Sequence, residues 1–142
     1  MEQLSVPGIL ASHDAMIAFL ERQTELAGLD PKASYRLHLA VDEIVANIIT
    51  HGYEENGLTG DILLTSEIRP ETFVFTLEDG SPPFDPRTLA KPASLDQSLE
   101  DRPIGGLGIF LMLRSVDAFD YTYIEGRNRN ILTMNRSANP VS

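Results

Sequence analysis

A helix with a polar border occupies the middle of the chain. Residues 31–51 carry an apolar stripe at helical spacing, made of Leu37, Val41, Ile44, Val45 and Ile48. Glu43, Asn47 and His51 follow one another at intervals of four, so their side chains stack along the edge of that stripe. Burying polar groups without partners is costly, so these residues are either half-solvated boundary positions or one wall of a polar site. The helix alone favours the boundary interpretation.

The surrounding elements occur in an order that predicts two layers. Ser12 and Asp30 are expected to begin helices, and Gly28 and Gly52 to end them. A third helix is expected over 109–116, and strands over 2–9, 61–68, 72–78, 118–124 and 130–136, with a turn at 125–128. This order predicts an α+β fold, in which a mixed, mostly antiparallel sheet carries its helices on one face as a two-layer α/β sandwich.

The charge of the chain limits its partners. It has 142 residues, with 11 Lys and Arg against 21 Asp and Glu, for a formal net charge of −10. That charge repels the phosphates of nucleic acids and anionic membranes, so neither is an expected partner. There is no apolar run of about 18 residues and no signal-peptide layout, so we expect one cytoplasmic domain over residues 1–142. The absence of cysteine excludes disulfides and thiolate chemistry.

Asp79 is a candidate binding residue at the end of an apolar strand. It is followed by Gly80 and Ser81, so its carboxylate can accept a hydrogen bond from an exocyclic amine such as that of adenine. Taken alone, the same three residues favour the alternative of an Asx turn that ends a strand.

A glycine cluster precedes the third helix and is a candidate phosphate site. It consists of Gly105, Gly106, Leu107 and Gly108. The free N–H groups and the positive end of the helix favour an anion at this position. The alternative is a hinge before a buried helix. The cluster matches neither a Walker A loop nor a Rossmann fingerprint.

The combination of these motifs is more specific than any one of them. A Glu-x-x-x-Asn helix, an Asp-led turn, a proline-rich loop and a Gly-Gly-x-Gly helix start follow in that order. This resembles the nucleotide-binding domain of the GHKL ATPase superfamily, and within it the small anti-sigma-factor serine kinases. Residues 43–53 are similar to the N box of that family, residues 79–85 to its first glycine box and residues 102–111 to its second. The resemblance spans residues 5–136 and implies the Bergerat fold.

The resemblance implies that ATP and Mg²⁺ bind to the chain. Asn47 would ligate the Mg²⁺, and Glu43 would be the general base that accepts the proton of a serine hydroxyl. Asp79 would bind the adenine amino group, and Thr133 in the last strand would lie beside the adenine. The phosphates would meet backbone N–H groups of Gly105, Gly106, Leu107 and Gly108. Residues 86–104 would form the ATP lid, and residues 137–142 a tail.

Ser81 is a departure from the family pattern. The first glycine box of the family usually reads Asp-x-Gly, whereas this chain has Asp79, Gly80 and Ser81. The adenine contact remains on Asp79, but the approach of the backbone at Ser81 to the base, and with it the nucleotide affinity, depends on how the serine is accommodated.

Three functions compete at this point. The leading hypothesis, implied by the resemblance, is an ATP- and Mg²⁺-dependent protein serine kinase that phosphorylates an anti-anti-sigma (STAS-type) protein and binds a sigma factor as a homodimer. The second is a nucleotide-gated binding module without chemistry. The third is a detached ATP domain of a histidine kinase, although no extended helical hairpin surrounds His13, which we interpret as a surface residue. His51 is expected to support the site rather than to act as a catalyst.

Overall fold

Five strands form a single antiparallel sheet in the order β1-β2-β3-β5-β4. The computed structural model describes residues 1–89 and 106–136, so Gly105, most of the expected lid and the expected tail lie outside it. The strands are β1 (Glu2–Pro7), β2 (Asp61–Ile68), β3 (Thr72–Asp79), β4 (Ala118–Ile124) and β5 (Arg127–Asn135). Each pair of neighbouring strands among these is antiparallel, whereas the sequence predicted a mixed, mostly antiparallel sheet.

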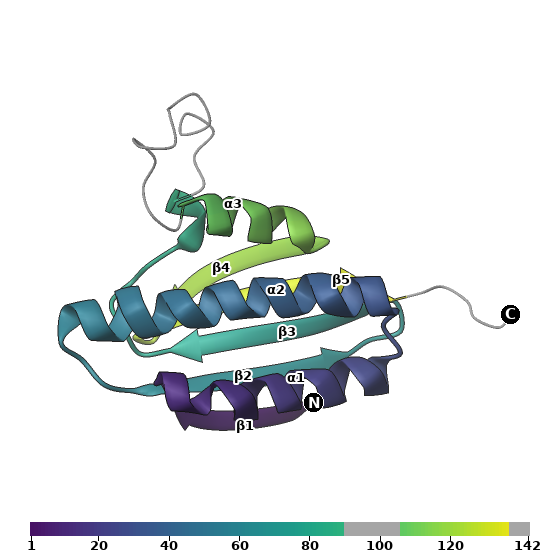
Figure 1. Ribbon diagram of the computed structural model, residues 1–142, viewed down its shortest axis with the longest axis horizontal. Helices are drawn as coiled ribbons and strands as arrows, with labels where there is room; N and C mark the ends of the chain where they lie inside the picture. Colours follow the sequence, from purple (N-terminus) through teal and green to yellow (C-terminus); the bar gives the residue numbers. More distant parts are fainter. Residues whose placement is uncertain (90–105, 137–142) are drawn as a thin grey trace, which may run out of the picture.

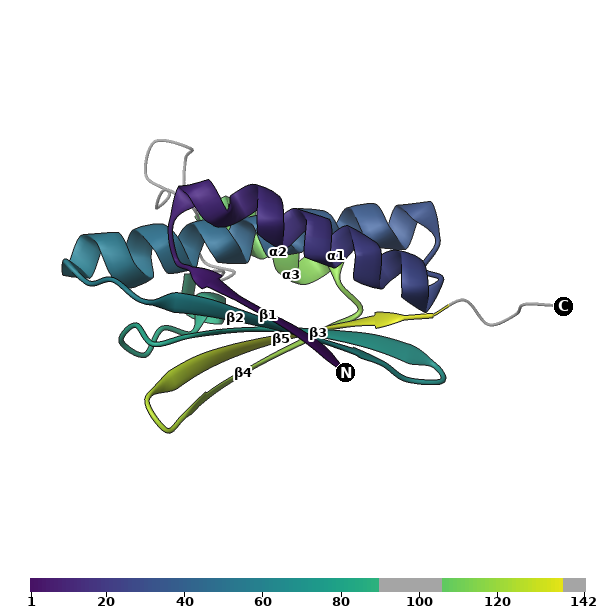
Figure 2. The same ribbon diagram turned by 90° about the horizontal axis from the view of Figure 1, so that it is seen from below.

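The helices cover one face of the sheet, which confirms the two-layer α/β sandwich (Figure 2). They are α1 (His13–Ala27), α2 (Pro31–Asn47) and α3 (Gly106–Ser115). In Figure 1, α1 lies on the β1 side, α2 runs along the middle and α3 lies beside α2 on the β4 side. Within residues 1–89 and 106–136, no helix is both long and apolar enough to cross a bilayer.

Alternation along the strands builds the core between the two layers. Phe73, Phe75 and Leu77 of β3 are fully buried beneath the helices, as their alternation with Val74, Thr76 and Glu78 predicts. Burial of a large apolar side chain is worth about 1.5–3 kcal/mol, so these positions hold β3 at the centre of the sheet. Their partners from the helices and from β5 include Met16, Leu20, Leu37, Val41, Ile44, Leu132 and Met134.

Most of the expected helix signals are confirmed at α1 and α2. Asp30 caps α2 by accepting a hydrogen bond from the Ala33 N–H at 2.8 Å. Gly28 ends α1 in the left-handed conformation, with φ +69°. Ser12 precedes α1 as expected but makes no side-chain cap, because residues Leu10–Ser12 already form a 3₁₀ turn that leads into the helix.

The prediction that Gly52 ends the second helix is wrong. The α-helix stops at Asn47, but the chain continues as a π-helical segment (Ile48–Tyr53) and a 3₁₀ turn (Glu54–Asn56). The left-handed residue that ends the run is Gly57, with φ +64°. A π-helical turn is wider than an α-helical one and is frequent at functional sites. Here it carries Gly52 and Tyr53 into the interior.

His13 is more than a surface residue. Its Nε2 lies 2.9 Å from Oδ1 of Asp42, and Nε2 of His38 lies 3.3 Å from Oδ2 of the same carboxylate. The half-exposed Asp42 therefore joins the start of α1 to the middle of α2.

Candidate functional site

A small cavity lies where the end of α2 faces the ends of β3 and β5. Its lining comprises Ile44, Asn47, Ile48, Gly52, Asp79, Ser81, Phe84, Pro86, Asn128 and Asn130. The structure thus brings together three of the residues that the sequence singled out, Asn47, Asp79 and Ser81. The cavity volume is about 10 Å³, which is room for about one water molecule. A flat ring enters only if part of this lining moves outward.

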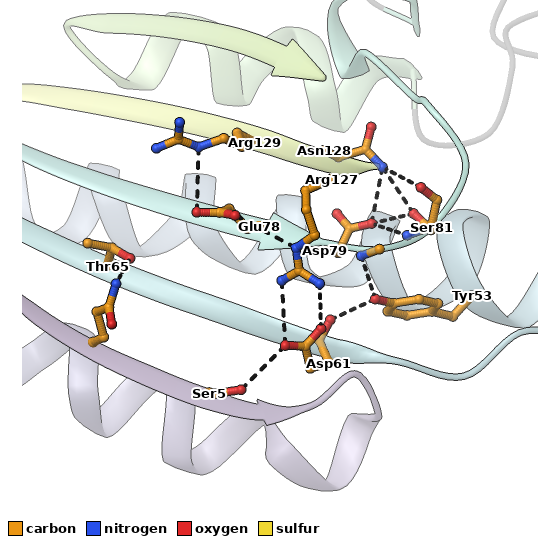
Figure 3. A network of polar contacts seen from close by, with 12 residues as sticks. Ser5, Tyr53, Asp61, Thr65, Glu78, Asp79, Ser81, Arg127, Asn128 and Arg129 are labelled. Atoms are coloured by element: carbon orange, nitrogen blue, oxygen red, sulfur yellow. Dashed lines mark hydrogen bonds and ion pairs between the residues drawn. The ribbon is translucent and has the colours of Figure 1, made fainter. Parts of the chain in front are cut away.

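Asp79 is the buried anion of the cavity. It is the last residue of β3, points to the helix side with Leu77, and is 1% exposed. Its Oδ1 accepts hydrogen bonds from the Ser81 N–H at 2.9 Å, from the Ser81 hydroxyl, and from the Asn128 amide at 3.2 Å (Figure 3). Among the described residues no donor bonds Oδ2. The carboxylate is therefore oriented through one oxygen, and the other remains to accept from a ligand.

Gly52 is the residue that accommodates Ser81. A Cβ on Gly52 would lie 2.6 Å from Ser81 Oγ and 3.0 Å from Ser81 Cβ. The serine side chain is thus packed against the bare backbone of the π-helical segment and bonded to Asp79. This contact explains how a serine fits where the family pattern has glycine.

Asn128 fastens the loop that follows β3. Its amide nitrogen donates to the carbonyl oxygens of Ser81 at 2.9 Å and Pro82 at 3.0 Å. Its amide oxygen accepts from the Phe84 N–H at 2.9 Å and from the Tyr121 hydroxyl. One buried side chain therefore satisfies several polar groups of a loop that has no regular secondary structure.

Asn128 was not expected at the site, because the sequence predicts a turn at this residue. The turn is shorter than expected, and β5 already begins at Arg127. The signal that was present is the alternation of Asn128 and Asn130 with the core residues Leu132 and Met134, which places all four on one face of a strand.

Asn130 carries the clearest unmet hydrogen-bonding capacity in the cavity. It is 3% exposed, and its Oδ1 has no hydrogen-bond partner within the described part of the chain. Leaving a buried acceptor unpaired costs about 1–3 kcal/mol. A ligand that donates to this oxygen would remove that cost, so Asn130 is a candidate binding residue beside Asp79.

Thr133 does not line the cavity, so the expectation that it lies beside the pocket is wrong. It pairs with Val74 of β3 and Ala118 of β4, positions that alternate with the core residues. Its side chain is therefore on the sheet face opposite to the helices. The residues of β5 that reach the cavity are Asn128 and Asn130.

Tyr53 anchors the Asp79 turn from the π-helical segment. Its hydroxyl donates to the Asp61 carbonyl at 2.7 Å and accepts from the Gly80 N–H at 2.8 Å (Figure 3). The ring fits only because two glycines face it, since a Cβ on Gly8 or Gly60 would lie 2.7 or 2.6 Å from its atoms. Burial raises the pKa of the Tyr53 hydroxyl, so the group stays protonated and able to donate.

A network of charges supports the same turn from the other face of the sheet. Arg127 pairs with Asp61 at 2.9 Å and lies 3.7 Å from Glu78, which also faces Arg129 at 3.5 Å (Figure 3). The hydrogen bond from Arg127 lowers the pKa of Asp61, and the same bond raises the pKa of Arg127. These pairs link the ends of β2, β3 and β5 next to Asp79.

Asn47 and Glu43 are joined to each other on α2. The Asn47 amide nitrogen donates to the Glu43 carbonyl at 2.9 Å and to Glu43 Oε2 at 3.3 Å. Because the nitrogen is turned toward Glu43, the amide oxygen is the group that Asn47 can offer to a cation. One such oxygen fits Mg²⁺, which takes one or two protein ligands and completes its shell with phosphate and water. The described residues contain no cluster of three His, Cys, Asp or Glu that could hold a metal.

The Glu43 carboxylate lies against the first turn of α3. A Cβ on Gly108 would lie 2.7 Å from Glu43 Oε1, so the glycine is what allows this approach. The helix begins earlier than the expected residue 109, because Gly106, Leu107 and Gly108 are the first three residues of α3. N–H groups in a first turn have no partner within their helix and favour an anion nearby.

His51 stands outside the cavity lining. Its Nδ1 lies 3.0 Å from Glu55 Oε1, and its ring centroid lies 6.3 Å from that of Phe84, a cavity residue. His51 thus contacts the outer side of the site.

Comparison with known proteins identifies the class. The family described as the histidine kinase-like ATPase domain matches residues 7–136. The chain belongs to this family, as the motifs had indicated.

Among curated proteins, the chain is similar to the serine-protein kinase RsbW of Staphylococcus aureus. In strains JH9 and Newman alike, it is 32% identical over 82 residues, which cover 56% of this chain and 52% of the relative. The chain thus spans about half the length of the curated relatives it matches.

Two solved structures share the fold. The histidine kinase AdeS of Acinetobacter baumannii aligns with a TM-score of 0.52 at 11% identity, over 96% of this chain and 68% of that one. The histidine kinase domain of the blue-light activated histidine kinase of Erythrobacter litoralis EL346 aligns with a TM-score of 0.51 at 14% identity, over 82% of this chain and 59% of that one. These likenesses confirm the fold class.

Proposed function

We propose that the chain is an ATP- and Mg²⁺-dependent protein serine kinase that acts as an anti-sigma factor. Its phosphoacceptor would be an anti-anti-sigma (STAS-type) protein, and its other partner a sigma factor. The observation that carries the proposal is the hydrogen-bonded pair of Glu43 and Asn47 at the edge of the cavity. The pair presents a carboxylate and an amide oxygen that can ligate a metal ion. The similarity to RsbW, whose name states a serine-protein kinase, supports the same reaction.

The adenine would occupy the cavity between α2 and β5. Its amino group would donate to Asp79 Oδ2, and Asn130 would offer its unpaired Oδ1 to the same ring. Because the cavity has a volume of about 10 Å³ before a ring enters, the loop residues Phe84 and Pro86 would have to move outward. The strand residues are held by the sheet and would stay in place.

The phosphates would lie between Asn47 and the first turn of α3. Asn47 would bind Mg²⁺ through Oδ1, and the metal would offset the charge of the triphosphate. That offset matters in a chain of net charge −10, which otherwise repels an anion. The backbone N–H groups of Gly106, Leu107 and Gly108 would donate to the phosphate oxygens.

Glu43 would accept the proton in the transfer step. The serine hydroxyl of the partner gives its proton to a Glu43 carboxylate oxygen while the serine Oγ bonds to the γ-phosphorus. The bond between that phosphorus and the bridging oxygen to the β-phosphate breaks, and ADP leaves with its electron pair. Phosphoserine and ADP are the products. The proximity of Glu43 to Asn47, with Asn47 Nδ2 3.3 Å from Glu43 Oε2, orients the base beside the metal position.

A second candidate function is a nucleotide-gated binding module without chemistry. The observation that supports it is Ser81, which stands where the family pattern has glycine and is bonded to Asp79, because this change beside the adenine position leaves the Asp79 contact for gating but departs from the pattern of the active kinases.

The type of phosphate formed distinguishes these functions. The protein is incubated with γ-labelled ATP, Mg²⁺ and each anti-anti-sigma-type protein from the same genome. We expect acid-stable phosphoserine on one of them. Acid-labile phosphate would indicate a histidine kinase domain, and nucleotide-dependent binding without labelled partner would indicate the binding module. A homodimer remains a prediction that sedimentation can test.

A further inference from the structure

A second hollow lies between α2 and α3, outside the cavity. It has a volume of about 190 Å³ and is lined by Leu39, Glu43, Gly108, Leu111, Met112 and Ser115. Figure 1 shows the two helices side by side above the sheet. With a volume of about 190 Å³ against about 10 Å³ for the cavity, this groove between α2 and α3 accepts a side chain without rearrangement.

The groove and the cavity meet at the pair of Glu43 and Asn47. Asn47 lines the cavity, whereas Glu43 lines the groove and is not part of the cavity lining. The hydrogen bond between their side chains, with Asn47 Nδ2 3.3 Å from Glu43 Oε2, connects the two spaces. A nucleotide in the cavity and a hydroxyl that reaches Glu43 would therefore approach this pair from different sides.

The groove is apolar except at the Glu43 end. Met112 forms its buried floor, while Leu39 and Leu111 on its walls remain 44% and 54% exposed. The Ser115 hydroxyl donates to the Leu111 carbonyl at 2.8 Å, so its proton is already used. The two exposed leucines beside Glu43 thus give the groove apolar surface that an aliphatic side chain can cover.

We propose that this groove binds an aliphatic side chain of the partner protein, close in sequence to its phosphoacceptor serine. The inference rests on the proposed function, because it takes Glu43 as the base for that serine. The serine hydroxyl must come within about 2.6–3.2 Å of the carboxylate. Leu39 is one helical turn from Glu43, a distance of about 5–6 Å between Cβ atoms.

The geometry limits where the aliphatic side chain lies in the partner sequence. Side chains on one face are about 7 Å apart at i, i+2 in an extended segment and about 5–6 Å apart at i, i+3 or i, i+4 in a helix. A residue about two to four positions from the serine therefore spans the distance from Glu43 to Leu39 and Leu111.

Charge adds a second requirement on the partner. Among the described residues that line the groove, Glu43 is the only ionisable group. In a chain of net charge −10, an acidic residue next to the serine would meet repulsion that no cation among these described lining residues offsets. The structure thus assigns to the acceptor segment an aliphatic side chain and neutral or basic neighbours.

Substitution of the groove walls tests the inference. The variants Leu39→Asp and Leu111→Asp are compared with the wild type in two assays that use the anti-anti-sigma-type proteins of the same genome. Partner binding is measured in the presence of Mg²⁺ and ADP, and partner phosphorylation in the presence of Mg²⁺ and ATP. We expect each variant to weaken partner binding, or raise the KM for the partner, at least about tenfold, with ATP affinity unchanged. Leu26→Asp is the matched control, because Leu26 is an exposed leucine on α1 (64%) away from the groove. The conservative Leu111→Met should retain partner binding.

Each outcome separates this inference from the proposed function. If the wild type forms phosphoserine and both groove variants bind the partner as the control does, the groove assignment is wrong and the kinase stands. If the wild type binds a partner without phosphorylating it and the groove variants lose that binding, the assignment of the groove as a partner site is supported and the proposed kinase activity is contradicted. If the wild type binds none of these proteins, both fall.

Discussion

The contact between Gly52 and Ser81 yields the most specific prediction. Gly52→Ala places a methyl group 2.6 Å from Ser81 Oγ and 3.0 Å from Ser81 Cβ, both shorter than van der Waals contact. The methyl group cannot be accommodated by a simple rotation of the serine, because its hydroxyl is bonded to Asp79 and the residue is buried. We therefore expect the alanine to push the Asp79 turn out of position.

The expected cost follows from overpacking. Inserting one methyl group into a packed interior costs about 1–3 kcal/mol. Ser81→Gly removes both contacting atoms, so the double variant should lose almost none of its stability relative to Ser81→Gly alone. The coupling free energy between the two sites should thus be about 1–3 kcal/mol, within the range for residues in contact.

A double-mutant cycle measures this coupling. Urea unfolding at 25 °C gives the free energy of unfolding of the wild type, both single variants and the double variant. In parallel, titration with a fluorescent ATP analogue should show that Gly52→Ala weakens nucleotide binding and that Ser81→Gly restores it. The control is Ala46→Gly at an exposed site on α2, which measures how much an exchange between glycine and alanine changes stability through helix propensity alone. Gly28→Ala is unsuitable for this purpose because φ is positive at Gly28.

Equal destabilisation by Gly52→Ala with serine and with glycine at position 81 would contradict the proposed contact. That result would mean that the glycine serves the backbone of the π-helical segment rather than the contact with Ser81.

Three further predictions concern the support of the site. Tyr53→Phe leaves the Gly80 N–H without its partner, so it should lower the free energy of unfolding by about 2 kcal/mol in urea titrations; no change would contradict the anchoring role. Asn130→Val removes a buried unpaired acceptor, so it should leave the free protein as stable or more stable but weaken binding of the ATP analogue; unchanged affinity would exclude Asn130 from the site. Asp61→Asn should cost its full amount of stability above the ordinary aspartate pKa of 3.8 and progressively less below it, because Arg127 lowers the pKa of the folded carboxyl and the contribution is lost as the pH falls through that lowered value. Urea unfolding of both proteins across this pH range should show the difference shrink toward acid, and a constant difference would contradict it.

Local pattern was sufficient to predict the layers of the fold. Alternation in β3 identified its buried face, and the Asp30 cap and the left-handed Gly28 marked helix boundaries through interactions between neighbouring residues. The end of the second helix was mispredicted because Gly52 is required by a contact with a residue far along the chain. The absence of a side chain at Gly52 leaves room for Ser81, and this contact cannot be inferred from the residues next to Gly52 in the sequence.

Strand register limited what could be predicted of the site. Asp79 and Ser81 stand in a recognisable motif and do line the cavity. On β5, however, a shift of one residue exchanges the two faces of a strand, and the only candidate that the sequence analysis named on this strand was Thr133. The pairing of Thr133 with Val74 places it on the face away from the helices, and the cavity receives Asn128 and Asn130 instead.

The division of roles between Glu43 and Asn47 is tested most directly by kcat and ATP affinity measured together. We expect Glu43→Gln to lower the rate of phosphoserine formation at least about a hundredfold, the scale of general-base catalysis, while the Kd for ATP changes little. Asn47→Ala should instead weaken ATP binding in the presence of Mg²⁺. Glu21→Gln, an exposed glutamate on α1, is the matched control and should match the wild type. A Glu43→Gln variant that forms phosphoserine at the wild-type rate would contradict the assignment of Glu43 as the base, and with it the proposed mechanism.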